Sequence, residues 1–196
     1  GFSTQTLKPK TYIFRAILFE MNAMMKILQS KRRRLIFLGF VILLAGILRL
    51  YNLEADPDIK IDGDTGIFTD EGLYSLSARN LALFGTFNAN PDSRVVEAVD
   101  SPIYTYSEYL SFKLFGVNIK AMRFPSIFFS LLTILIAYLV IGKIFCLLEG
   151  IVVLVFLSLN YMFIQYNRLA LLETLMAFLF LASSYFYLVE RTACTG

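Results

Sequence analysis

Apolar stretches with at most one charged residue each alternate with polar segments along this chain and predict four transmembrane helices. The first stretch covers residues 35–53, provided that Arg49 reaches out to the membrane surface. The other three cover residues 124–142, 150–167 and 169–189. A helix needs about 20 predominantly apolar residues to cross the hydrocarbon core, and each stretch comes close to that length. The pattern therefore predicts an all-α, polytopic membrane protein.

The polar segment between the first two stretches carries two predicted amphipathic helices. One runs from Asp70 to Phe84, and Gly85 ends it. The other starts at Ser101-Pro102, a capping residue followed by proline at the first helical position, and runs to Gly116. Its tyrosines favour a position at the membrane interface rather than across it. In the first helix, one apolar side is predicted to consist of Leu73, Leu76, Leu81 and Phe84.

Composition and charge agree with a membrane location. Hydrophobic residues make up 57% of the chain and charged residues 17%, below the roughly 25% of soluble domains. Residues 51–118 contain 11 acidic and four basic residues, whereas residues 1–34 contain eight basic residues and one acidic. By the positive-inside rule both ends lie in the cytoplasm and the acidic loop lies outside. This segregated charge indicates topology and argues against a nucleic-acid partner.

These observations predict the following organisation. The basic cluster before residue 35 and the lack of an A-x-A-like cleavage site favour an uncleaved signal anchor. Four helices are too few to enclose the polar groups among them, so we expect the chain to be the amino-terminal part of a longer protein. The predicted parts are a cytoplasmic segment (1–34), the first transmembrane helix (35–53), an outer catalytic loop (54–120), three further transmembrane helices (121–190) and a short truncated tail (191–196).

Residue types that bind metals are sparse. The chain has no His, and its two Cys residues are far apart, so a zinc site is not predicted. The acidic run after residue 55 hints at a calcium-binding EF-hand. With Asp58 as the first ligand, however, Lys60 takes the third position and Thr69 the twelfth, where a bidentate Glu is required. No metal ligands are therefore predicted, and a divalent metal stays open as a cofactor.

Three acidic residues are candidates for catalysis. Asp70 and Glu71 lie at the start of the first loop helix, where carboxylates also stabilise a helix by accepting from free amide groups. In a catalytic reading Asp70 is a general base and Glu71 anchors the helix or orients a partner. Glu173 lies near the outer end of the last apolar stretch, where a charge is costly unless it is paired or faces a cavity.

Three arginines lie towards the same predicted side of the membrane. Arg79 is in the first loop helix, Arg123 precedes the second apolar stretch, and Arg168 precedes the last. Each can serve as an interfacial anchor, but a guanidinium group at this depth can also bind a lipid phosphate. A lipid-linked phosphate donor needs cations for the leaving phosphate and a base for the attacking hydroxyl, and this side of the chain offers both.

Several short motifs resemble, in their order, the GT-C membrane glycosyltransferases, and most closely the protein-mannosyltransferase and aminoarabinose-transferase group. The resemblance covers about residues 50–190. Each motif is weak alone, whereas their order relative to the apolar stretches is more specific. They are LRL (48–50), TDEGLY (69–74) with ARN (78–80), SPIY (101–104), LFGV (114–117), MRFPS (122–126) and YNRLALLE (166–173).

The resemblance implies an inverting transfer of a sugar from a polyprenyl-phosphate donor to a lipid, protein or glycan on the outer face of a prokaryotic plasma membrane. Asp70 matches the loop acid of the family, and Glu173 matches a second acid that is usually Asp there. The family often has Lys or His before the prolines of the second loop helix, whereas this chain has Asp100-Ser101. A membrane transporter and a non-catalytic membrane subunit are the alternative functions.

Overall fold

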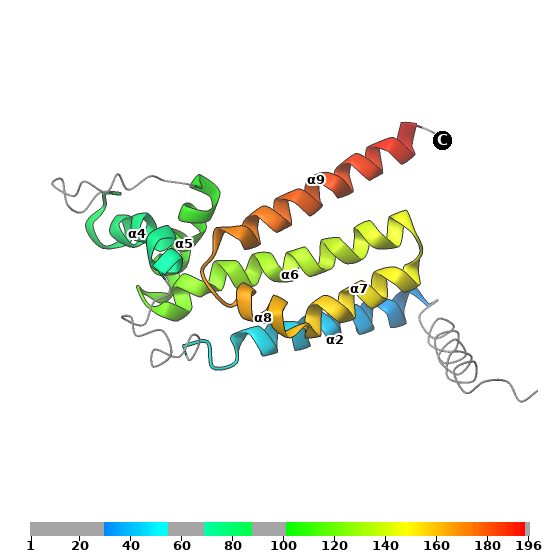
Figure 1. The fold of residues 1–196 in the computed structure, drawn as a ribbon, viewed down its shortest axis with the longest axis horizontal. Helices are drawn as coiled ribbons and strands as arrows, with labels where there is room; N and C mark the ends of the chain where they lie inside the picture. Colours follow the sequence, from blue (N-terminus) through cyan, green and yellow to red (C-terminus); the bar gives the residue numbers. More distant parts are fainter. Residues whose placement is uncertain (1–29, 55–68, 88–100, 195–196) are drawn as a thin grey trace, which may run out of the picture. The chain divides into compact units, whose positions relative to one another are not determined.

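The computed structural model describes residues 30–54, 69–87 and 101–194. All regular elements in these ranges are helices (Figure 1). The predicted all-α architecture is therefore confirmed. In chain order the helices are α2 (Lys31–Leu50), α4 (Thr69–Phe84), α5 (Pro102–Phe115), α6 (Ile119–Ile144), α7 (Leu147–Leu159), α8 (Tyr161–Asn167) and α9 (Leu172–Cys194).

The chain divides into two compact units, residues 1–40 and 41–196. In the first unit the described residues are 30–40, which form the basic start and the following turns of α2. The acidic run at residues 56–64, which hints at an EF-hand, lies outside the described residues. All contacts discussed below belong to the second unit.

The two loop helices end at the glycines that the sequence indicates. Gly85 follows α4 with a φ of 74°, and Gly116 follows α5 with a φ of 79°. These positive φ angles suit glycine, which has no Cβ to clash with the backbone. Ser101 precedes α5 with Pro102 at the first helical position, although its side chain makes no capping hydrogen bond. The turn chemistry thus predicted both helices correctly.

The pattern predicted one transmembrane helix over residues 150–167, but this stretch does not form one straight helix. It is divided into α7 and α8, which meet at an angle of 63°. Asn160 lies at the break, and its side chain accepts a hydrogen bond from Phe163 N at 2.9 Å. An Asn side chain that caps a new helix competes with continuation of the old one, which accounts for the bend.

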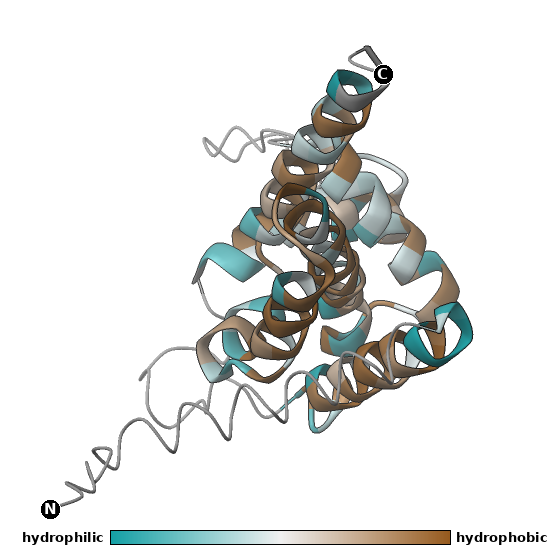
Figure 2. Cartoon of the chain, turned by 90° about the vertical axis from the view of Figure 1, so that its right-hand side faces the viewer, coloured by the Kyte–Doolittle hydropathy of each residue, from teal (hydrophilic) through white to brown (hydrophobic). Residues whose placement is uncertain are grey.

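Two of the described helices, α6 and α9, are long and apolar enough to cross a membrane, and the bent pair α7–α8 makes a third if it acts as one span. Hydrophobic residues predominate along these helices (Figure 2). The four basic residues at the start of α2 and Arg49 near its end leave that helix more charged than the others. The fourth span therefore stays a prediction.

Helix α6 packs against both α7 and α9 (Figure 1). Helix α7 comes close to α6 at Gly150, where an added Cβ would lie 2.8 Å from Tyr138 O and 3.2 Å from backbone atoms of Gly142. No other residue type fits there without moving a backbone. Glycine at this position is what allows the α6–α7 hairpin to close.

The prediction that Arg49 reaches out to the membrane surface is wrong, because its side chain is fully buried within the protein. Nη1 donates to Ala45 O and Ser158 O, and Nη2 donates to Leu157 O at 3.2 Å. The last carbonyls of a helix have no partner within that helix and carry partial negative charge. Arg49 satisfies two of them at the end of α7, which makes burial of its charge tolerable.

The pair α4–α5 buries its polar side and exposes its apolar side. Leu73 and Phe84, which belong to the predicted apolar side of α4, are 53% and 61% exposed. Glu71, Ser75 and Asn80 are buried instead. Hydrocarbon or an interfacial environment can accept exposed apolar side chains, whereas polar side chains need partners inside the protein. The buried side of α5 consists of Tyr104, Thr105, Glu108, Ser111 and Phe112.

Candidate functional site

The centre of the candidate site is a buried ion pair between α4 and α6. Glu71 is fully buried and Arg123 is 2% exposed. Arg123 Nε donates to Glu71 Oε1 at 2.6 Å, and Nη2 donates to Oε2 at 2.9 Å. Glu71 Oε1 also accepts from Ala170 N at 2.8 Å. One carboxylate therefore joins the first loop helix to α6 and to the turn before α9.

Two arginines hold the segment that follows α2. Arg123 Nη1 donates to Leu53 O at 2.5 Å, and Arg168 Nη2 donates to Asn52 O at 2.8 Å. Asn52 has a φ of 48°, a left-handed conformation that Asn tolerates better than most residues. The turn after α2 is thus fixed by cations from α6 and from the connection between α8 and α9.

The structure brings three of the motifs together, because the TDEGLY, MRFPS and YNRLALLE segments all contribute to the contacts of Glu71. The turn after α2 joins them through Leu53 O and Asn52 O. The sequence singled out both Glu71 and Arg123 but gave no sign that they form a pair. Arg123 was predicted to bind the donor phosphate. In this structure its three guanidinium nitrogens contact Glu71 and Leu53.

The remaining predicted site residues are more accessible. Asp70 and Glu173 are exposed in the first turns of α4 and α9, and Arg168 is half-buried. The hydrogen bond from Ala170 N to Glu71 brings two segments of the chain together. Asp70 directly precedes Glu71 in one segment, and Arg168 and Glu173 lie within three residues of Ala170 in the other. Arg79 is exposed and nine residues beyond Asp70 in α4. At about 100° per residue, the two side chains point to opposite faces of the helix.

Glu108 in α5 is a buried acid that is not among the predicted site residues. Its side chain is fully buried, and Oε1 accepts from Ser75 Oγ of α4 at 2.7 Å. Oε2 has no hydrogen-bond partner among the described residues. The signal was a lone acid at the middle of a helix that otherwise reads as a tyrosine-rich interfacial segment. An amphipathic interpretation would place such an acid in water rather than in the protein interior.

Burial raises the pKa of Glu108 to about 8, although the hydroxyl groups of Ser75 and Tyr104 act in the opposite direction. The negative charge of Glu71 raises this pKa further. One turn earlier, burial and the charge of Glu108 raise the pKa of Tyr104. The Tyr104 hydroxyl lies 2.8 Å from Ser126 Oγ, which in turn donates to Leu171 O at 3.4 Å. Polar contacts therefore join α5 to α6 and to the turn before α9.

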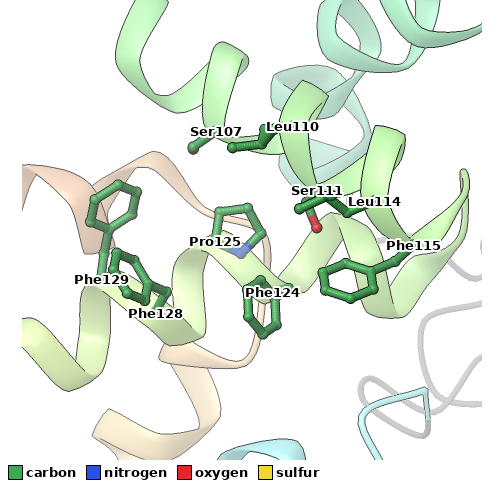
Figure 3. A pocket seen from close by; sticks show the side chains of 9 residues that line it. All are labelled: Ser107, Leu110, Ser111, Leu114, Phe115, Phe124, Pro125, Phe128 and Phe129. Atoms are coloured by element: carbon green, nitrogen blue, oxygen red, sulfur yellow. The ribbon is translucent and has the colours of Figure 1, made fainter.

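Two pockets adjoin the loop helices. The first, of about 220 Å³, lies between α5 and α6 and is shown in Figure 3. Apolar side chains with two serines line it, so it can accept hydrocarbon but has no charge for a phosphate. Its lining residues are Ser107, Leu110, Ser111, Leu114, Phe115, Phe124, Pro125, Phe128 and Phe129.

The second pocket, of about 340 Å³, has Gly72, Ser75 and Arg79 of α4 along one wall. Arg79 is the predicted site residue that lines it, and Asp70 lies on the opposite face of the same helix. In the part of the chain that the structure describes, no three His, Cys, Asp or Glu residues are grouped as metal ligands would be.

Comparison with known proteins supports the resemblance seen in the motifs. Residues 99–193, just under half of the chain, match the family model described as dolichyl-phosphate-mannose-protein mannosyltransferase. Arg123, Arg168 and Glu173 lie inside the matched range, whereas Asp70, Glu71 and Arg79 precede it. No curated protein and no solved structure matches the chain.

The apolar helices indicate a multi-pass membrane protein, and residues 99–193 are similar to glycosyltransferases of the GT-C kind. More particularly, residues 99–193 are mannosyltransferase-like sequence of that class.

Proposed function

We propose that this chain is the amino-terminal part of an inverting glycosyltransferase that uses a polyprenyl-phosphate-linked sugar, with mannose as the first sugar to test. The observation that carries the proposal is the buried contact of Glu71 with Arg123 and Ala170 N, because it fixes α4 beside the turn that carries Arg168 and Glu173. The acceptor is a lipid, protein or glycan at the outer face of a prokaryotic plasma membrane.

In this proposal Asp70 is the general base. The acceptor hydroxyl attacks the anomeric carbon of the donor sugar, its proton passes to Asp70, and the bond from that carbon to the phosphate oxygen breaks. The polyprenyl phosphate leaves with the bonding electron pair. Asp70 is exposed next to the rigidly held Glu71, so an acceptor can reach it. Glu71 positions the helix, and Glu173 is a second acid at the same site.

The leaving phosphate requires positive charge, and the predicted ligands are Arg79, Arg123 and Arg168. Of these, Arg168 has the position best suited to act together with Asp70, because it lies two residues before Ala170, which binds Glu71. Arg123 supports the site through Glu71. Arg79 points away from Asp70, so its role as a phosphate ligand requires a donor that extends around α4.

The test is sugar transfer by Asp70→Asn in the full-length enzyme. Loss of a general base typically slows a reaction by about 100- to 10,000-fold, whereas Asn caps a helix about as well as Asp does. The measurement is release of radiolabelled mannose from a polyprenyl-phosphate-mannose donor in membranes, normalised to inserted protein. We expect a loss of at least about 100-fold.

The matched control is Glu54→Gln, which removes an exposed carboxylate that pairs with Lys120. It should leave transfer unchanged. Near-normal transfer by Asp70→Asn would leave the mechanism without a base and contradict the proposal.

A further inference from the structure

The buried acid Glu108 has no part in the proposed reaction, yet it lies in the polar interior between the two loop helices. Glu108 and Ser75 connect α5 to α4 through a side-chain hydrogen bond of 2.7 Å. The same helix α4 carries Asp70 and Glu71 in its first turn. Any change at Glu108 therefore acts on the helix that presents the proposed base.

The charged and titratable groups around Glu108 come from three helices. The negative charge of Glu71 on α4 raises the pKa of Glu108, and the Tyr104 hydroxyl on α5 lowers it. Arg123 on α6 binds Glu71 through both carboxylate oxygens. Arg123 is thus engaged by one acid. A second buried negative charge would have no matching cation among these groups, and an uncompensated buried charge is strongly destabilising.

We propose that Glu108 is a positioning residue that is built into the fold as a neutral carboxylic acid, where it joins α5 to α4 and leaves Arg123 to Glu71 alone. Ser75 donates to Oε1, so the acid proton belongs on Oε2, the oxygen that has no other partner among the described residues. The effect of this residue on catalysis rests on the proposed function, whereas its effect on folding does not.

If Glu108 is neutral in the folded protein, folding takes up a proton wherever the unfolded chain has it ionised. The direction of the pH dependence of stability follows from the pKa values of Glu108 in the two states. The pKa of Glu108 is about 8 in the folded protein against 4.5 for an ordinary Glu. Between these values the folded state binds more protons than the unfolded state, so stability falls as pH rises. The expected loss is about tenfold in the unfolding equilibrium per pH unit from about pH 4.5 to pH 8, after which it levels off.

Glu108→Gln tests this directly, because Gln reproduces the neutral acid in shape and does not ionise. Equilibrium unfolding of the wild-type protein and of this variant is measured in detergent micelles from pH 5 to pH 9. We expect similar stability at pH 5 and a growing advantage for Glu108→Gln up to pH 8. The matched control Glu190→Gln, at an exposed position of α9, should follow the wild-type profile. A constant difference between wild type and Glu108→Gln across this range would overturn the proposal.

A second variant keeps the test valid if Glu108→Gln does not accumulate. Ser75→Ala removes the hydrogen bond that lowers the pKa of Glu108, so the pH at which the stability curve levels off should move upward. An unchanged curve would count against a neutral Glu108.

Transfer activity is measured separately on the same variants. Wild type should lose activity as pH passes about 8, whereas Glu108→Gln should keep its neutral-pH rate across that range. Identical pH profiles for the two proteins would remove the positioning role. If no sugar is transferred at all but the stability curves differ as expected, the proposed function fails and the neutral buried acid stands.

Discussion

The helix pairs α4–α5 and α6–α7 are held together in opposite ways. In α4–α5 the side chains between the helices include Ser75 and Glu108, and large apolar residues such as Leu73 and Leu110 face outward. In α6–α7 the backbones touch at Gly150, and the interior is mostly aliphatic, as at Ile134, Ile151 and Leu154.

This difference suits different roles. Close backbone contact through small residues is a common way to pack helices in a membrane, where apolar surface alone gives little preference for another helix over lipid. Polar contacts are directional, and they fix the rotation of a helix about its own axis. Helix α4 carries two of the three candidate catalytic residues, Asp70 and Glu71, so its orientation matters more than its packing density.

The largest loss of stability is expected when the buried ion pair between Glu71 and Arg123 is broken. Glu71→Gln leaves Arg123 buried without a counter-charge, and removal of one partner of a buried pair costs about 3–5 kcal/mol in the free energy of unfolding. The double variant Glu71→Gln/Arg123→Gln removes both charges and should recover a large part of this loss. Unfolding in detergent micelles gives both values.

The control for this comparison is the exposed pair Lys120–Glu54, with side chains 63% and 57% exposed. Lys120→Gln should change stability by no more than about 1 kcal/mol. A double variant at positions 71 and 123 that is less stable than Glu71→Gln alone would show that the charges themselves stabilise the site.

A smaller loss of stability is expected for a substitution between α6 and α7. In Gly150→Ala the new Cβ would meet Tyr138 O at 2.8 Å, so the helices must separate. Overpacking of this kind costs about 1–3 kcal/mol. The same unfolding measurement applies, with Gly142→Ala as control, since a Cβ at that residue meets nothing within 4 Å. Equal stability of the two variants would mean that α6 and α7 do not depend on this contact.

The smallest difference in stability is expected between substitutions of Asn118 and Ser101, two residues that both precede a helix and resemble helix caps in the sequence. Asn118 accepts from Ala121 N at 2.9 Å, whereas the Ser101 side chain makes no capping hydrogen bond. Asn118→Ala should therefore cost about 1 kcal/mol, and Ser101→Ala close to nothing. Thermal unfolding of the two variants side by side decides this, and a larger shift for Ser101→Ala would be inconsistent with the cap geometry.

Local signals in the sequence sufficed to predict the loop helices. Proline after Ser101 and glycine at positions 85 and 116 mark helix ends through backbone geometry that any environment must respect. The break at Asn160 had a comparable signal, a good capping residue inside an apolar stretch, but the stretch as a whole fits a single span equally well.

Which face of each helix is buried could not be predicted in the same way. Leu73 and Phe84 belong to the apolar side of α4, and in water an apolar side is the one that a helix buries. Next to a membrane this rule reverses, and Glu71 and Glu108 become interior residues. The sequence identified Glu71 and Arg123 separately, but their pairing over 52 residues depends on the tertiary fold.

Asp70 and Glu71 are adjacent but differ in burial, and we expect different tasks of them: the exposed Asp70 is the proposed base, and the buried Glu71 holds α4 in place. The most direct test measures both transfer and unfolding for Asp70→Asn and for Glu71→Gln in the same full-length enzyme. Asp70→Asn should lose transfer by at least about 100-fold while its stability stays that of wild type. Glu71→Gln should lose about 3–5 kcal/mol of stability. Normal transfer by Asp70→Asn together with unchanged stability of Glu71→Gln would contradict this division between the two acids.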